Sequence, residues 1–198
     1  MVRTKLAAGL RAASPTGAKL VERADTRLTV VATPWLTGWQ VVDVLNLAPP
    51  HPQRFYAALS ADGTVRVLTG EPDEFSHVAT EAGLRVASAS VAVAVATTFL
   101  DSTQDFVRAS YRVDRIEDVQ WLSQRTAAQE KRRRAIIADY GDQVGRAEAE
   151  RSGTGWRASV WMVYDHRLDR HRVTIAADGA VTDRAETVVD GLPVADSY

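Results

Sequence analysis

The chain has 198 residues, with 24 lysines and arginines, 25 aspartates and glutamates, and no cysteine. A formal net charge of −1 provides no whole-molecule field that would attract nucleic acid or an anionic membrane, so we expect neither as a partner. The missing cysteines exclude disulfides, thiolate catalysis and cysteine-ligated zinc, and the length fits one large domain or two of about 100 residues.

Three features of the sequence bear on the source and location of the protein. Arginine outnumbers lysine 21 to 3, which is typical of a high-GC bacterial genome. The N-terminus carries Arg3 and Lys5 like a signal peptide, but its apolar stretch ends at Arg11 after five residues, whereas a secretory signal needs about 7–15. No run approaches the roughly 20 apolar residues of a membrane span. These observations predict a cytoplasmic bacterial protein.

The N-terminal region is expected to form one helix and two short strands. Apolar residues four apart predict an amphipathic helix over residues 2–13, and the Ser-Pro-Thr-Gly sequence at residues 14–17 should end it. Runs rich in valine and leucine then predict strands at residues 19–22 and 28–32.

A three-stranded antiparallel meander is expected next. The prolines of residues 48–52 cannot continue a hydrogen-bonded ladder, so they predict a hairpin loop. Gly63, which follows Asp62, predicts a tight turn, because glycine tolerates the positive φ that such turns need. The expected elements are strands at residues 39–47, 54–60 and 65–68 and a helix at residues 71–82.

The second half of the chain repeats this alternation of helix and meander. Residues 86–101 could be a strand by the alternation of their valines, but their length and alanine content favour a helix. The remaining expected elements are strands at residues 106–113 and 116–122, a charged helix at 124–140, a hairpin that begins at Trp156, and a last strand at 181–189.

Two stretches of the chain, residues 37–65 and 154–181, begin and end with the same short sequence motifs. Thr-Gly-Trp opens both, at Trp39 and Trp156, and Ala-Asp-Gly-x-Val closes both, at Gly63 and Gly179. The offset is 117 residues at the tryptophans and 116 at the glycines, so the connecting loop differs by one residue. This period is too long for a solenoid repeat and fits a duplicated small domain.

We therefore predict an α+β fold of two tandem duplicated domains, at residues 1–84 and 85–198, each with a helix and a curved antiparallel meander. This order of elements resembles cystatin-like and nuclear-transport-factor-like folds, in which a curved sheet wraps a helix. The resemblance implies an architecture and no particular activity, because one fold hosts unrelated functions.

The densest group of metal-ligand residue types is Asp165, His166, Asp169 and His171. Two histidines and two aspartates could hold a divalent cation. However, we expect residues 165–171 at a hairpin tip, where polar residues are common, and they have neither HxH nor HExxH spacing. A solvated turn is therefore predicted, with no metal and no other cofactor.

The tryptophans divide into core candidates and binding candidates. Trp39 and Trp156 occupy the same place in both stretches, so each is expected to seal a core. Trp161 lies on the opposite strand face and is either an exposed anchor for a partner or a plug between the two halves. The candidate binding residues are Arg157, Trp161, Tyr164 and His171.

Asp43 is the leading catalytic candidate, since a carboxylate on an otherwise apolar strand face could serve as a general base. Alternatively, Arg54 or Arg66 from the following strands pairs with it. Asp165 and His166 are weaker candidates for the same role.

The remaining motifs carry little functional signal. The Lys-Arg-Arg-Arg run at residues 131–134 follows Glu130 and has no aromatic platform beside it, so we expect a solvated helix face. Residues 153–158 fit a loose GxGxxA spacing, but they precede a strand where a dinucleotide loop must open a helix. No phosphate-binding loop or GxSxG elbow is present.

Two functions remain open. The first is a non-catalytic binding or accessory protein that holds a peptide or protein partner, because meanders with open edges offer strand addition and concave faces. The second is a cofactor-independent enzyme, an isomerase, cyclase or hydrolase, acting on a small molecule. It would hold that molecule in an apolar pocket, with a single carboxylate or histidine as acid or base.

Overall fold

The computed structural model describes residues 2–48 and 52–195. Over these residues the chain forms five α-helices and two antiparallel sheets, which confirms the expected α+β class. Residues 49–51 of the expected proline loop lie outside this part of the chain. None of the described helices combines the length and the apolar character needed to cross a bilayer.

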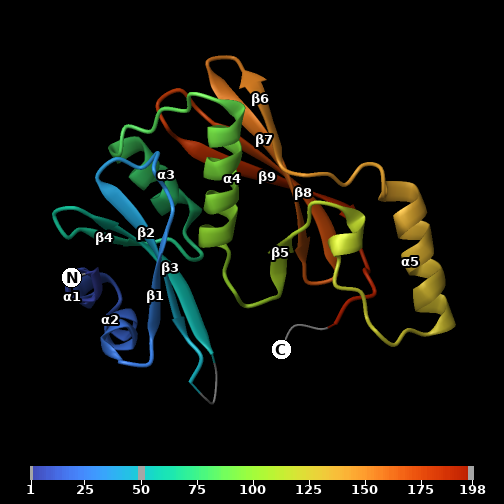
Figure 1. Cartoon of the computed structure of the whole chain (residues 1–198), viewed down its shortest axis with the longest axis horizontal. Coiled ribbons are helices and arrows are strands. Elements are labelled where there is room, and N and C mark those ends of the chain that lie inside the picture. Colours follow the sequence, from blue (N-terminus) through green and yellow to red (C-terminus); the bar gives the residue numbers. More distant parts are fainter. Residues whose placement is uncertain (1, 49–51, 196–198) are drawn as a thin grey trace. The chain divides into compact units, whose positions relative to one another are not determined.

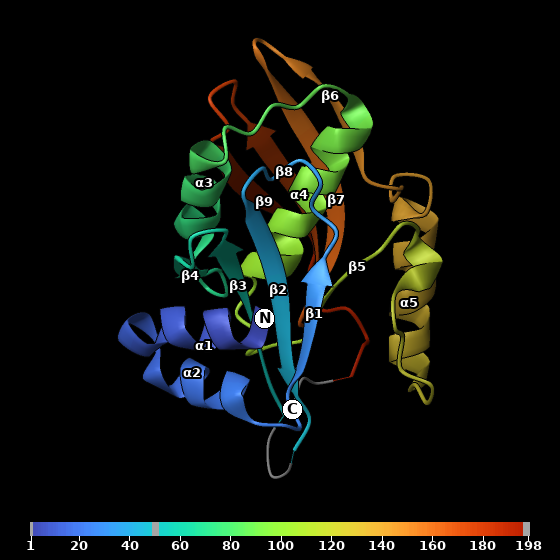
Figure 2. The ribbon, with the colours of Figure 1, turned by 60° about the vertical axis from the view of Figure 1, so that its left-hand side comes forward.

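The first sheet has the strand order β1-β2-β3-β4, and every neighbouring pair is antiparallel. Helices α1 and α2 lie side by side on one of its faces (Figures 1 and 2), where they share a hydrophobic cluster with Val42, Val44, Ala57 and Leu59. The elements are α1 (Val2–Ala13), α2 (Pro15–Glu22), β1 (Arg27–Val31), β2 (Trp39–Asn46), β3 (Gln53–Ser60), β4 (Val65–Val67) and α3 (Pro72–Glu81).

The strand expected at residues 19–22 is wrong, because these residues form the end of α2. A local cap starts this helix: the Ser14 hydroxyl accepts a hydrogen bond from the backbone N–H of Gly17 at 3.2 Å. Pro15 stands in the first turn, where its fixed φ favours a helix. The Ser-Pro-Thr-Gly sequence therefore begins a second helix as well as following the first.

The second sheet has the order β5-β7-β8-β9, and β6 also pairs with β7. Strand β7 is its centre, since β8 pairs along most of its length, β6 pairs with its N-terminal half and β5 with its C-terminal end. The elements are α4 (Ala89–Thr103), β5 (Ser110–Arg112), the 3₁₀ helix η1 (Ile116–Asp118), α5 (Ala127–Tyr140), β6 (Glu148–Ser152), β7 (Gly155–Tyr164), β8 (Arg167–Ile175) and β9 (Val181–Val189).

The strand expected at residues 116–122 is also wrong. Its first three residues form η1, and Trp121 makes only an isolated bridge, to Val194. The Asp118 carboxylate accepts a hydrogen bond from the backbone N–H of Asp114 at 3.2 Å, which closes a turn that a strand cannot adopt. Strand β6, in contrast, was not expected at all.

The chain divides into two compact units that are not continuous in sequence. The first unit comprises the chain up to Val86, with Thr98–Asp105 and Ala176–Thr182; the second comprises Ala87–Thr97, Phe106–Ile175 and the segment from Asp183. The turn between β8 and β9 therefore belongs to the first unit. There the backbone N–H of Val181 donates to the Ser76 hydroxyl of α3 at 3.0 Å.

Both stretches with shared end points fold as antiparallel meanders and close on equivalent glycine turns. Gly63 has a φ of +98° and Gly179 a φ of +94°, a region that residues with a Cβ rarely adopt. The hydrogen bonds around the two turns also match, since the N–H of Ser60 donates to the Thr64 carbonyl at 2.9 Å and that of Ala176 to the Ala180 carbonyl at 2.8 Å.

The tryptophans, however, do not superpose together with these turns. Trp39 pairs with Ser60, whereas Trp156 pairs with Ile175, whose counterpart in the first meander is Leu59. A register difference of one residue moves a side chain to the other face of a sheet. Counted from the turns, the two tryptophans thus lie on opposite faces. Trp156 is buried as expected, at 8% exposure, while Trp39 is only partly buried.

We predict that Gly179→Ala lowers the free energy of unfolding more than Gly63→Ala does. Both variants place a side chain at positive φ, which costs about 1–2 kcal/mol. At Gly179 the new Cβ would also lie 3.2 Å from the Ala79 carbonyl oxygen and 3.3 Å from the Leu84 Cβ, whereas nothing lies within 4 Å at Gly63. Chemical denaturation measures both losses, and equal losses would contradict the packing of this turn on the residues at the end of α3.

Candidate functional site

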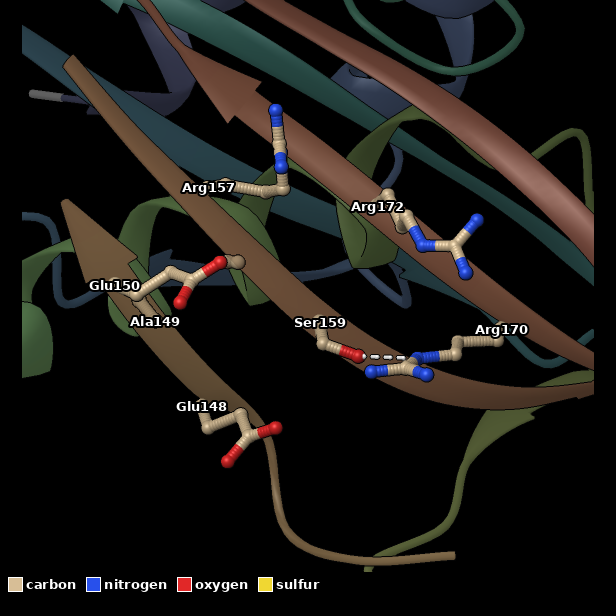
Figure 3. Close-up of a pocket in the computed structure, with 8 residues that line it drawn as sticks. Glu148, Ala149, Glu150, Arg157, Ser159, Arg170 and Arg172 are labelled. Carbon is tan, nitrogen blue, oxygen red and sulfur yellow. Dashed lines mark hydrogen bonds between the residues drawn. The ribbon is translucent and has the colours of Figure 1, made fainter. Parts of the chain in front are cut away.

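An open hollow lies on one face of the second sheet, beside the N-terminal half of β7 (Figure 3). Its volume of about 330 Å³ is at the lower end of the usual range for ligand sites. We call it the arginine hollow. Its lining residues are Glu148, Ala149 and Glu150 of β6, Arg157, Ala158 and Ser159 of β7, and Arg170 and Arg172 of β8.

The strand register brings the polar side chains of the hollow to one face of the sheet. Glu150 lies opposite Arg157 across the β6–β7 pair. Ser159 lies opposite Glu148 on one side and opposite Arg172 on the other. Because directly opposite residues of antiparallel strands project to the same face, the five side chains share one surface.

The same face of β7 is covered further along the strand. Trp161 and Val163 continue the alternation of Arg157 and Ser159, but they are buried in a cluster that includes Ile136 of α5. The exposed fraction falls to 6% at Trp161 and to 0% at Val163. The hydrophobic cover thus begins at Trp161, and the half of the face that precedes it is open.

Trp161 was expected to be either an exposed anchor or a plug between the two halves, and its burial excludes the exposed anchor. Every buried residue of its cluster belongs to the second unit, so the indole serves that unit's own core. Trp161 also contacts one arginine of the hollow. The guanidinium carbon of Arg170 lies over the indole ring, 5.6 Å from the ring centroid, in a cation–π arrangement.

Two of the three arginines are held in place by neighbours. The Nε–H of Arg170 donates to the Ser159 hydroxyl at 2.8 Å (Figure 3), which fixes the plane of its guanidinium. An Nη of Arg172 lies 2.7 Å from the carboxylate of Glu186 on β9, so its charge is balanced.

The other charged side chains of the hollow are unpaired. Within residues 2–48 and 52–195, the side chains of Arg157, Glu148 and Glu150 make no hydrogen bond or ion pair, although Glu150 stands directly opposite Arg157. Figure 3 shows the Arg157 guanidinium and the Glu150 carboxylate pointing in different directions. All three residues are exposed, so their charges are available to a ligand.

A second polar hollow surrounds the β7–β8 turn, which consists of Asp165 and His166. Asp165 forms an ion pair with Arg108 and adopts a φ of +56°. His166 Nδ1 lies 3.0 Å from the carbonyl oxygen of Leu192, and its Nε2 is 3.9 Å from Asp165. Tyr164 also lines this hollow. These contacts hold the turn in place.

Asp169 and His171 do not lie at the hairpin tip where they were expected, because both belong to β8 and project to the face opposite the arginine hollow. His171 Nδ1 is 2.7 Å from a carboxylate oxygen of Asp183. Asp169 is 3% exposed, with one oxygen 3.7 Å from Arg167. In the described part of the chain, no three His, Asp or Glu residues are grouped so that they could hold a metal ion.

Asp43 is ion-paired, as its second interpretation proposed. Arg54 donates two hydrogen bonds to its carboxylate, each of 2.9 Å, and a further one of 2.6 Å to the Tyr56 hydroxyl. The hydrogen bonding to Asp43 raises the pKa of Arg54. Burial, together with the charge of Asp43, raises the pKa of Tyr56. A carboxylate engaged by a fixed guanidinium is poorly placed to accept a substrate proton.

The basic run at residues 131–134 is engaged in part by an acid of its own helix. Glu130 lies 3.2 Å from Arg133 and 3.0 Å from Arg134, and 2.7 Å from Arg125, which precedes α5. Hydrogen bonds from Arg125 and Arg134 lower the pKa of Glu130 to about 2. Two arginines of the run thus form ion pairs within α5.

No protein-family model matches the chain, and comparisons with curated proteins and with solved structures find no significant match. Evidence about function therefore comes from the geometry of the site.

Sequence reasoning identified Arg157 but missed the other polar residues of the arginine hollow. Two of these residues, Glu148 and Glu150, lie on β6, and only a short sequence pattern indicates this strand. Glu148 and Glu150 alternate with small or polar residues, and the two-residue turn Gly153-Thr154 follows, with Gly153 at a φ of +60°. An alternating segment before such a turn predicts a hairpin with β7.

We predict that Asp43→Asn lowers the free energy of unfolding by about 1 kcal/mol, because a partly exposed, bidentate ion pair loses its charge. A double-mutant cycle with Arg54→Ala, measured by denaturation, should give a coupling energy of similar size. A coupling energy of zero would contradict the stabilising role of this pair.

The acid stability of the protein should depend on Glu130. Its folded-state pKa of about 2 lies below the ordinary value of 4.5, so its ion pairs contribute stability above pH 4.5 that is lost as the pH falls toward 2. Glu130→Gln should therefore flatten the loss of melting temperature over this range. If the wild type and the variant lose stability in parallel between these two pH values, the prediction is wrong.

Proposed function

We propose that this chain is a non-catalytic binding protein that holds a peptide or protein partner in the arginine hollow. One observation carries the proposal: in an open hollow of the sheet, Arg157, Glu148 and Glu150 carry charges that no described side chain satisfies. Charged groups without internal partners can form ion pairs and hydrogen bonds with a partner without first breaking internal ones.

The way Arg170 is held supports this proposal. Its guanidinium lies over the buried Trp161 ring and is hydrogen-bonded to Ser159, so little of its side-chain freedom remains to be lost on binding. Arginine is enriched at interfaces because its planar group combines stacking with bidentate hydrogen bonding to carboxylates.

The enzyme alternative has less support. It needs an apolar pocket with one acid or base, whereas the hollow around Asp165 and His166 is lined mainly by charged side chains. Asp43, the strongest candidate base, is engaged by Arg54. We therefore retain the enzyme only as the second candidate.

We also infer that the two meanders arose by duplication and that each half has the cystatin-like or nuclear-transport-factor-like arrangement of a helix and a curved sheet. The equivalent turns at Gly63 and Gly179 support this inference. The one-residue displacement between Trp39 and Trp156 then reflects a one-residue change in one copy.

A library of random peptides tests the proposed function. Peptides selected on the wild-type protein should bind Arg157→Ala and Arg170→Ala with a Kd raised by about tenfold or more, since each removes a charge-assisted contact. Arg27→Ala is the matched control, because Arg27 is an exposed strand arginine of the other sheet, and it should leave the Kd unchanged. Fluorescence anisotropy measures these constants. The proposal fails if no peptide is enriched, or if the enriched peptides bind the three variants equally.

A further inference from the structure

The charges of the arginine hollow are segregated by strand. Both carboxylates, of Glu148 and Glu150, come from β6, while the guanidiniums come from β7 and β8. Because Arg172 is balanced by Glu186, the positive charges that remain are those of Arg157 and Arg170. Two available cations therefore face two available anions across the hollow, which is a dipole with no excess of either sign.

This dipole distinguishes between classes of ligand. A polyanion that reaches the guanidiniums would place further negative charge near Glu148 and Glu150, and a polycation would meet Arg157 and Arg170 in the same way. Like charges brought together at an interface are costly, so both classes are disfavoured. A ligand that carries one group of each sign satisfies both sides of the hollow.

The dimensions of the sheet indicate how far apart these groups should be. Neighbouring strands lie about 4.8 Å apart, so the carboxylates on β6 and the guanidiniums on β7 and β8 are separated by about 5–10 Å at the backbone. In an extended peptide, residues two positions apart project to the same side and are about 6.5–7 Å apart. An acidic and a basic residue at this spacing match the hollow.

We propose that the arginine hollow selects an extended peptide segment in which an acidic and a basic residue stand two positions apart. The acidic side chain binds Arg157 and Arg170, and the basic side chain binds Glu148 and Glu150. This inference rests on the proposed function and adds to it the chemistry of the partner.

Three matched synthetic peptides test the inference: one with alternating Glu-Thr-Arg-Thr units, one with every Arg replaced by Glu, and one with every Glu replaced by Arg. Measured by fluorescence anisotropy, the wild-type protein should bind the mixed peptide at least about tenfold more tightly than either of the others. Equal or tighter binding of the all-acidic or all-basic peptide would overturn the inference.

Variants of the protein should change this preference in a defined direction. Glu148→Arg with Glu150→Arg should shift the preference to the all-acidic peptide, and the neutral pair Glu148→Gln with Glu150→Gln should remove the discrimination against it. Arg157→Glu should weaken binding of the mixed peptide by at least about tenfold, while Arg27→Glu in the other sheet should leave the peptide preference unchanged. If the double variants at Glu148 and Glu150 have the same peptide preference as the wild type, the inference is overturned.

The outcomes separate the two claims. If all-acidic peptides are preferred but lose affinity in Arg157→Ala, the hollow still binds a partner and only the dipolar ligand is wrong. If none of the three peptides binds and the random library also yields none, both the inference and the proposed function fail.

Discussion

The hydrophobic cluster around Trp161 determines where the second sheet can be open. Strand β7 presents one continuous face, but apolar partners from α5, from η1 and from the C-terminal segment cover it only from Trp161 onward. Burial of a large indole supplies much of the energy that holds such a layer on a sheet. The residues before Trp161 can then be polar without a cost in desolvation, and they carry the arginine hollow.

The fold was predictable wherever a long segment had a clear period or a defined turn. The helix at residues 2–13 and the turns at Gly63 and Gly179 follow from such signals. Short apolar runs were not predictable in the same way. Residues 19–22 were predicted to form a strand because Leu20 and Val21 stand at their centre, but the cap at Ser14 made them helical. Over so few residues, local hydrogen bonds outweigh intrinsic preference.

The candidate site was less predictable than the fold, because it depends on register and cover. Alternation along β7 correctly grouped Arg157 with Trp161 on one face, but it could not show which part of that face α5 covers. The matching end points at Trp39 and Trp156 likewise could not reveal that the two tryptophans stand one position apart in ladders of equal register. A one-residue displacement along a strand leaves the local motif intact and still places the side chain on the other face.

Asp43 and Glu150 show why pairing decides which charges can act. Asp43 lies diagonally across β2 and β3 from Arg54, and the pair forms two hydrogen bonds of 2.9 Å. Glu150 lies directly opposite Arg157, yet the two side chains do not meet. Both geometries allow a cross-strand ion pair, so sequence and register alone do not distinguish them. Asp43 thus contributes to the stability of the first sheet, whereas Glu150 and Arg157 of the second sheet remain without an ion pair in the described part of the chain.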